Sequence, residues 1–347
     1  MKKLNYLFAT VAMMVAMVLA SCSATDLPAD PNEPKIHDGD ELATAIAQYC
    51  EVVNGVPTLQ LPAGVSLTLN EPVNLNMPLV ISGNADNRAK IKVGAEGKFV
   101  TTSGIQFTGV DIDATDLASP LVTVGTEQPA EWEMFVVTFD YVNVVGLKKA
   151  LVYAACKNYQ GGVRLEDSHI QVAADVTVFD FTKGSVATVF DILRSTIWAP
   201  EATSKSLYSS QGGQKATEYS EEITQEFNFD ESTFYNLTKD KNFFSHRQSN
   251  QKWLSYTVKN CIFVNCGKKG QVVKGLNGGQ SGKNPVWAIS GNVFNFEDAD
   301  TSADESTGDD DEPVADSKAV VVKFADASKG DFTQSTVDAG DPDWYKK

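Results

Sequence analysis

Basic residues and cysteines are both scarce in this chain of 347 residues. It contains 29 lysines and arginines against 45 aspartates and glutamates, so its formal net charge is −16. Binding to DNA or RNA requires clustered basic side chains that neutralise phosphates, and this acidic balance argues against nucleic-acid partners. The five cysteines form no CxxC pair and no cluster with histidine. We therefore expect no zinc site and assign no metal ligand.

Long apolar runs are absent except for one near the N-terminus. The run Leu4–Leu19 follows two lysines and ends in small residues, as a cleaved export signal does. The adjoining Leu-Ala-Ser-Cys sequence resembles a lipobox, whose cysteine is lipidated and becomes the first mature residue. We predict a signal peptide over 1–21, lipidation of Cys22 and a flexible tether over 22–37. Because no later stretch offers the ~20 apolar residues of a membrane-spanning helix, the lipid would be the membrane attachment.

The mature chain contains one convincing helical pattern. Asp40 can cap a helix over 40–49, in which Leu42, Ile46 and Tyr49 fall on one face. Strand and turn patterns follow it to the C-terminus. We therefore expect this helix to cover the first turn of a β-rich domain.

A loose repeat runs through that domain. Each copy consists of an apolar run, a few small or polar residues and a further apolar residue. The last residues of successive copies lie between 26 (144 to 170) and 37 (197 to 234) positions apart. A period of this length, with strands and no helix inside it, predicts a solenoid. Leucine-rich repeats have a stricter pattern and propeller blades run ~40 residues or more, so a parallel β-helix fits best. The copies are Phe107–Ile112, Phe139–Val144, Leu165–Ile170, Ile192–Ile197, Phe229–Phe234, Val258–Phe263 and Ile289–Phe294.

Stacked coils bring equivalent residues of each repeat into line. Ser168, Ser195, Ser232, Cys261 and Asn292 are equivalent in the aligned copies. We predict that they form an internal ladder, which satisfies backbone groups at a bend.

The predicted fold is all-β, a right-handed parallel β-helix with a short N-terminal capping helix. One domain would span residues 38–347. It would include a polar, acidic insertion over 297–316 and a C-terminal cap over 319–347 that protects the open end of the solenoid.

Three stretches resemble pectin-lyase-like β-helix proteins. Pro57–Gly64 resembles the opening of that fold, while Val80–Ile91 and Ala339–Trp344 are similar to a group of surface lipoproteins from glycan-foraging gut anaerobes. Proteins of that group are built from two adjoining domains of unknown function, and the resemblance covers residues 40–347. It implies a pectin-lyase-like solenoid and an association with polysaccharide utilisation. Members often carry an N-terminal fibronectin-like module, which has no counterpart here, and usually have a basic residue in place of Asp343.

The sequence offers one lyase-like constellation. Hydrolases of the polygalacturonase type need an aspartate cluster with His and Arg/Lys motifs, and this chain contains no Asn-Thr-Asp, Gly-His-Gly or Arg-Ile-Lys. Pectate lyases need Ca²⁺-binding carboxylates beside an Arg or Lys base. Asp167, Arg194 and Glu231 are equivalent positions of three successive coils and could align within about 10 Å. A charge ladder on a solvated face explains the same residues.

Carboxylates are densest in the insertion over 297–316. They could bind Ca²⁺ loosely, but the spacing of an EF-hand loop is absent. A solvated loop is the preferred interpretation, and we expect no cofactor.

Outward-facing aromatic residues give the positive indication of a ligand. Trp198 and Tyr235 each follow an inward apolar residue, so both should point to solvent one coil apart. Their flat faces could stack on sugar rings, although single exposed aromatics are also common on surfaces. Arg164, His246 and Arg247 could donate hydrogen bonds to hydroxyls or uronate carboxylates.

The leading functional hypothesis is an exported outer-membrane lipoprotein, on the surface of a Gram-negative cell, that binds glycans without catalysis. One alternative is a polysaccharide lyase or glycoside hydrolase with an unrecognised site. The other is an adhesin-like structural rod.

Overall fold

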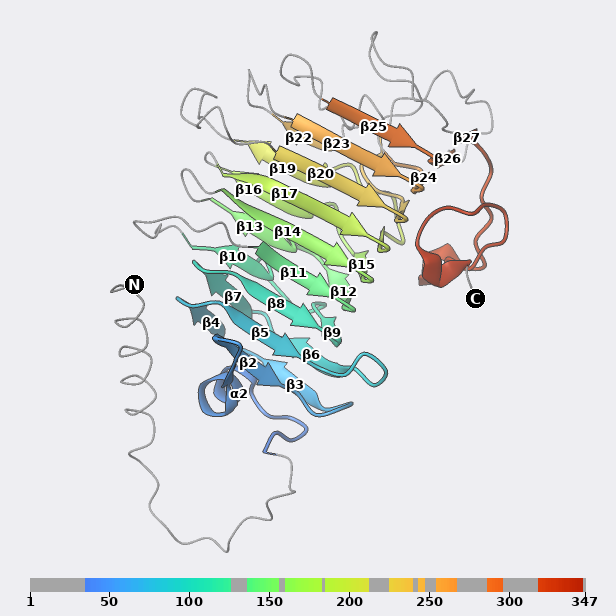
Figure 1. The fold of residues 1–347 in the computed structure, drawn as a ribbon. Coiled ribbons are helices and arrows are strands. Elements are labelled where there is room, and N and C mark those ends of the chain that lie inside the picture. Colours follow the sequence, from blue (N-terminus) through green and yellow to red (C-terminus); the bar gives the residue numbers. More distant parts are fainter. Residues whose placement is uncertain are drawn as a thin grey trace, which may run out of the picture.

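The chain folds as a parallel β-solenoid, as the repeat predicts (Figure 1). The computed structural model describes residues 35–125, 136–155, 160–182, 185–211, 225–239, 243–246, 254–266, 286–295 and 318–345. Within these residues three sheets follow the long axis of the molecule, and neighbouring strands come from successive coils, except for the antiparallel pair of Glu51–Val53 with Val56–Gln60 at the N-terminal end.

Sheet B contains, in spatial order, β1 (Glu51–Val53), β2 (Val56–Gln60), β5 (Leu79–Ser82), β8 (Ile105–Thr108), β11 (Val136–Asp140), β14 (Gln160–Glu166), β17 (Val186–Leu193), β20 (Gln225–Asp230), β23 (Leu254–Lys259) and β25 (Val286–Ser290). Sheet A contains β3 (Ser66–Leu69), β6 (Ala89–Val93), β9 (Val110–Asp113), β12 (Asn143–Leu147), β15 (His169–Val172), β18 (Thr196–Trp198), β21 (Thr233–Tyr235), β24 (Ile262–Val264), β26 (Val293–Asn295) and β27 (Lys318–Ala319). Sheet C contains β4 (Pro72–Leu75), β7 (Lys98–Thr101), β10 (Val122–Val124), β13 (Val152–Ala154), β16 (Phe179–Thr182), β19 (Tyr208–Gln211) and β22 (Phe244–His246).

Helix α2 (Leu42–Tyr49) lies at the N-terminal end of the solenoid, where the sequence places it (Figure 1). Leu42 is buried, and Ile46 and Tyr49 pack against the core. The predicted cap at Asp40 is wrong by one residue, because the N-cap is Glu41, which makes no side-chain capping bond. The Glu41 carboxylate instead accepts hydrogen bonds from Thr68 and Asn70 of the first coil.

The corner between sheets B and A is identical in successive coils. From β11 onward, two residues separate the last residue of the sheet B strand from the first residue of the sheet A strand. The first of the two has a positive φ, between 45° and 52°, at five of these corners. A left-handed residue lets the chain bend sharply without an inserted loop. These five residues are Tyr141, Asp167, Arg194, Glu231 and Asn260.

The second corner residue forms the predicted internal ladder, which the structure confirms. All five members are buried. Backbone N–H groups of Ser168 and Ser195 donate to the hydroxyls of the next coil, at 3.1 and 3.2 Å. Asn292 accepts from the Cys261 N–H at 2.9 Å and donates to the Val258 carbonyl at 2.8 Å. The ladder is structural, because it satisfies backbone groups that the bend removes from the sheets.

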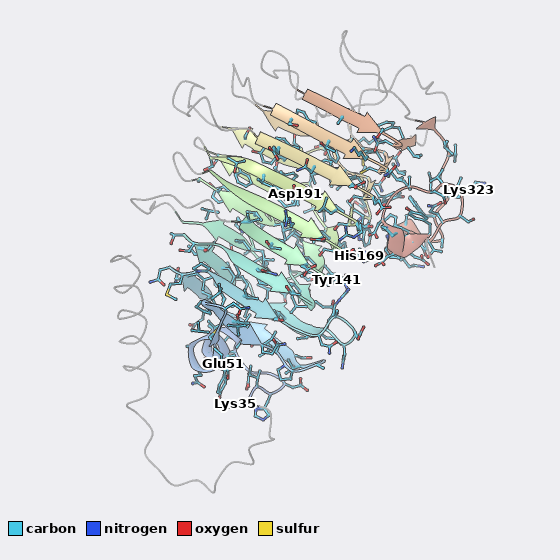
Figure 2. The ribbon with its side chains drawn as sticks, viewed as in Figure 1. Lys35, Glu51, Tyr141, His169, Asp191 and Lys323 are labelled. Atoms are coloured by element: carbon cyan, nitrogen blue, oxygen red, sulfur yellow. The ribbon has the colours of Figure 1, made fainter. Side chains whose placement is uncertain are left out.

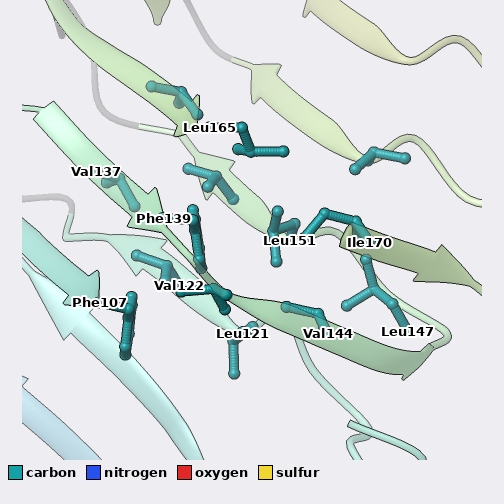
Figure 3. Packing of buried hydrophobic residues seen from close by; sticks show 14 of the residues in the cluster. Phe107, Leu121, Val122, Val137, Phe139, Val144, Leu147, Leu151, Leu165 and Ile170 are labelled. Atoms are coloured by element: carbon teal, nitrogen blue, oxygen red, sulfur yellow. The ribbon is translucent and has the colours of Figure 1, made fainter. Parts of the chain in front are cut away.

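Apolar side chains fill the inside of the coils in continuous columns. Figure 3 shows this packing around Phe107 and Phe139, whose rings stack 5.2 Å apart. In later coils the column of sheet B is aromatic, with Phe190, Phe227 and Tyr256 paired in register. Parallel pairing in register places each side chain directly above the equivalent side chain of the neighbouring coil, so the same ring-stacking contact recurs from coil to coil along the axis.

The predicted cap over 319–347 has an unexpected position. Within the described residues, Lys318–Ala319 alone extends sheet A at its end, by pairing with β26. Residues 320–345, called here the C-terminal segment, lie along the outer face of sheet A (Figure 1). This segment contains two short 3₁₀ turns, η3 (Ala327–Lys329) and η4 (Pro342–Trp344).

Candidate functional site

The outer face of sheet A is divided into an open part and a covered part. The register places Ser66, Lys90, Asp111, Asn143 and His169 in one column of outward-facing residues. The column continues in the next coils through residues 196, 233 and 262. The C-terminal segment covers the later positions and leaves the earlier ones accessible.

The open part is a shallow groove of about 410 Å³. It crosses strands β3, β6, β9 and β12, which at ~4.8 Å between strands gives a length on the order of 15 Å. That length suits a short stretch of an extended polymer. The outward side chains that line the groove are Ser66, Lys90, Lys92, Asp111, Asp113, Asn143 and Val145.

Hydrogen bonds and ion pairs fix the polar side chains of the groove floor. Asp111 accepts from Asn143 Nδ2 at 2.9 Å and lies 3.5 Å from Arg88. Lys92 pairs with Asp116 at 3.4 Å. Lys90 has no ion-pair partner among the described residues. Its ammonium is therefore available to an anionic or hydroxyl-rich ligand, while its neighbours are held in place.

The covered part is held by an aromatic cluster. Phe332 of the C-terminal segment is fully buried, and its ring centroid lies 5.8 Å from that of Trp198 and 5.5 Å from that of Tyr235. Two glycines with positive φ allow the close approach. A Cβ on Gly330 would lie 2.8 Å from the Trp198 ring, and one on Gly340 would lie 2.6 Å from the Thr233 hydroxyl.

This cover corrects the expectation that Trp198 and Tyr235 are exposed. Trp198 is only 7% exposed and Tyr235 is partly buried. Both side chains do point away from the inside of the coil, as the alternation predicts, but Phe332 and Phe324 lie over them. They are packing residues of the docked segment and are not available to stack on a sugar.

The boundary between the two parts is a polar junction at His169 (Figure 2). Its imidazole stacks on Trp344, with ring centroids 5.0 Å apart, and its Nε2 lies 3.1 Å from Asp341 Oδ2. The same carboxylate oxygen accepts from the Thr196 hydroxyl at 2.7 Å, which in turn accepts from the Trp344 indole N–H at 2.8 Å. Asp343 Oδ2 lies 3.7 Å from the same imidazole nitrogen.

The lyase-like residues stand at equivalent corners of three successive coils, and Arg194 is paired with acidic neighbours. Arg194 Nε donates to Asp167 Oδ1 at 2.8 Å and its second nitrogen contacts Glu166. The hydrogen bonds that Arg194 donates to these carboxylates raise its pKa, so the guanidinium holds its proton more firmly and is a poorer base. Glu231 occupies the equivalent corner of the next coil. The contacts of Arg194 fit the charge-ladder interpretation, which needs no substrate.

Asp140 lies near the same ladder. Burial raises its pKa, and the neighbouring Glu166 and Asp167 carboxylates add to that effect. Burial, together with repulsion between clustered carboxylates, explains the shift without a catalytic role.

Of the other predicted ligand contacts, Arg164 is described in full. It is half-exposed and donates two hydrogen bonds to the buried Asp191 carboxylate, at 3.0 and 2.8 Å. Asp191 also accepts from Asn228 at 2.8 Å, so Arg164 belongs to a polar network on sheet B. His246 is in β22, paired with Ser210, and its side chain is outside the described residues. Arg247, Cys22 and the insertion over 297–316 also lie outside them.

The described cysteines are inert. Cys50, Cys261 and Cys266 are free thiols. Burial raises the pKa of Cys50 to about 11 and that of Cys266 to about 12, so neither forms a thiolate near neutral pH.

The groove residues were missed by sequence reasoning. Lys90, Asp111 and Asn143 belong to one outward column, and the strand alternation around them was a usable signal. The repeat alignment began only at residue 107, so it gave no register for β3 and β6.

No protein-family model and no curated protein matches the chain. In the described part of the chain, no helix has the length and apolar character needed to cross a membrane.

Proposed function

We propose that the chain is a carbohydrate-binding, non-catalytic β-helix lipoprotein displayed at the cell surface. The observation that carries this proposal is the groove on sheet A, in which polar side chains of successive coils, among them Lys90, Asp111 and Asn143, stand side by side. Hydroxyl-rich polymers are recognised by fixed donors and acceptors of this kind. The N-terminal export and lipidation pattern supports a surface location, and the pectin-lyase-like resemblance supports the ligand class.

The free ammonium of Lys90 favours glycans that carry carboxylates. The neighbouring Asp111 is already compensated by Arg88 and Asn143, so it does not cancel the charge of Lys90. A charge-assisted hydrogen bond from Lys90 to a uronate would add both affinity and selectivity.

Binding should therefore depend on Lys90. We expect Lys90→Ala to weaken binding to the polysaccharide that the wild type retains by about 1–2 kcal/mol, roughly 5- to 30-fold, because one charged hydrogen bond is lost. Titration calorimetry with acidic and neutral polysaccharides measures this change. Lys98→Ala is the matched control, since Lys98 lies in β7 on sheet C.

Each outcome of that experiment is informative. Equal loss for both lysine variants would mean non-specific electrostatic attraction. Retention of no polysaccharide by the wild type would overturn the proposal and favour a structural rod. Release of unsaturated or reducing-end products during incubation would show that the protein is an enzyme.

The surface anchor is tested separately. Cys22→Ala should abolish fatty-acid incorporation, because the thiol is the acyl acceptor in a lipobox. Metabolic labelling with an alkyne fatty acid measures it, and Cys50→Ala, which alters a thiol of the folded domain, is the control. Labelling that persists in Cys22→Ala would rule out this attachment site.

A further inference from the structure

The junction at His169 brings together three metal-binding side chains from distant parts of the sequence. One ligand atom each of His169, Asp341 and Asp343 lies within 4.8 Å of the others. His169 begins strand β15, whereas Asp341 is the N-cap of the turn η4 in the C-terminal segment and Asp343 lies within that turn. Docking of that segment therefore creates the cluster.

We propose that His169, Asp341 and Asp343 form a binding site for a divalent transition-metal ion such as Zn²⁺. One imidazole and two carboxylates suit zinc and its neighbours in the first transition series better than Ca²⁺ or Mg²⁺, which prefer oxygen ligands alone. The bond lengths of zinc to nitrogen and oxygen, ~2.0–2.2 Å, place tetrahedral ligand atoms about 3.4 Å apart. The separations of 3.1 and 3.7 Å from His169 Nε2 to the two carboxylates bracket that value.

The charge balance of the junction also calls for a cation. Asp341 is only 1% exposed, and a buried carboxylate is costly unless it is paired. Among the described residues no lysine or arginine pairs with Asp341 or Asp343, and the basic group that both carboxylates contact is the His169 imidazole, which carries a charge only when protonated. A divalent ion would neutralise the two carboxylates together.

The surroundings hold the ligands as a metal site requires. Asp341 Oδ2 accepts from the Thr196 hydroxyl and Oδ1 accepts from the Asp343 N–H at 3.1 Å, so both carboxylate oxygens are oriented. Trp344 stacks on the imidazole and fixes the ring plane. Such supporting contacts normally accompany the direct ligands of a metal.

One side of the site stays accessible. Asp343 is 64% exposed and His169 is 23% exposed, so an ion can enter without unfolding the segment. Three protein ligands leave at least one coordination position for water or for an anionic group. The bound ion would join sheet A to the C-terminal segment at the end of the groove.

The test measures ion binding directly. The purified mature chain is stripped with chelator and titrated with ZnCl₂, with the bound ion counted by elemental analysis and the thermal midpoint followed. We expect one tight ion per chain and a higher midpoint, because an ion that binds only the folded state stabilises it. Co²⁺ in place of Zn²⁺ should give visible absorption bands that report the coordination of His169.

Variants distinguish this site from the many other carboxylates of the chain. Asp343→Asn and His169→Gln should each weaken Zn²⁺ binding at least about tenfold, because each removes one of three ligands. Asp343 is exposed, so its variant should fold normally. Asp338→Asn makes the same charge change on an exposed residue of the same segment and should bind like the wild type.

Two results would overturn the proposal. One is wild-type protein that binds no Zn²⁺ below millimolar concentration. The other is Asp343→Asn and His169→Gln binding the ion as tightly as Asp338→Asn does. Neither result bears on whether the groove binds a polysaccharide, because no sugar is present in this experiment.

Discussion

Replacing Phe332 by alanine should detach the C-terminal segment from sheet A while the solenoid stays folded. Phe332 is fully buried and contacts the rings of Trp198, Tyr235, Phe324 and Trp344, at centroid distances of 5.0 to 5.8 Å. Truncating a phenylalanine in such surroundings costs about 3–5 kcal/mol. The other apolar contacts of the segment are centred on Val322 and Ala339, away from Phe332, so this loss should expose the part around Phe332 to local unfolding.

Limited proteolysis followed by mass spectrometry measures the detachment. New cleavage within 320–345 should appear at protease concentrations that leave the wild type intact, and the fragment from the solenoid should survive. Val321→Ala is the control, because Val321 is 58% exposed in the same segment and its truncation removes little packing. An unchanged cleavage pattern in Phe332→Ala would show that the polar junction and the cluster around Val322 and Ala339 hold the segment without Phe332.

Replacing Phe190 by alanine should destabilise the solenoid itself. Phe190 is fully buried, with ring centroids of Phe179, Tyr208 and Phe227 at 4.8, 5.3 and 5.6 Å. It therefore joins sheets B and C within the interior. A loss of about 3–5 kcal/mol in the free energy of unfolding follows from the lost transfer energy and the cavity that remains.

Urea denaturation followed by circular dichroism measures this loss as a lower midpoint. The matched variant is Tyr141→Ala, since Tyr141 is an aromatic residue at a coil corner with 44% exposure. Its midpoint should move by no more than about 0.5 kcal/mol in equivalent free energy. Equal shifts for the two variants would mean that the aromatic column does not carry the stability assigned to it.

The inside of the solenoid could be predicted from sequence because stacked coils impose the same structural requirement at the same position of each repeat. A bend that must satisfy its backbone groups selects Ser, Cys or Asn at one position, and Ser168, Ser195 and Ser232 meet that demand at a regular place in the repeat. Alternation within each strand then assigns the inward and outward residues correctly.

Exposure of the outward residues could not be predicted in the same way. Trp198 is covered by Phe332, which lies more than 100 residues later, and no local pattern encodes that contact. The groove has the same origin, because it is the part of sheet A that the C-terminal segment does not reach. Asp341 is equally distant from His169, so the metal cluster has no signature in residue spacing.

The connections on the two sides of sheet B differ in how far their length varies. Those that lead to sheet A are constant in length, and those that arrive from sheet C, called here the variable edge, are not. The corner to sheet A holds two residues in every coil from β11 onward. By contrast, the connections from sheet C to sheet B run from Leu75 to Leu79, from Val124 to Val136 and from Gln211 to Gln225. Foreign peptides inserted at the variable edge, in the connections from sheet C to sheet B, would leave the stacking register of the strands intact. The solenoid is therefore a scaffold on which new loops can be grafted coil by coil, at a spacing set by the strands.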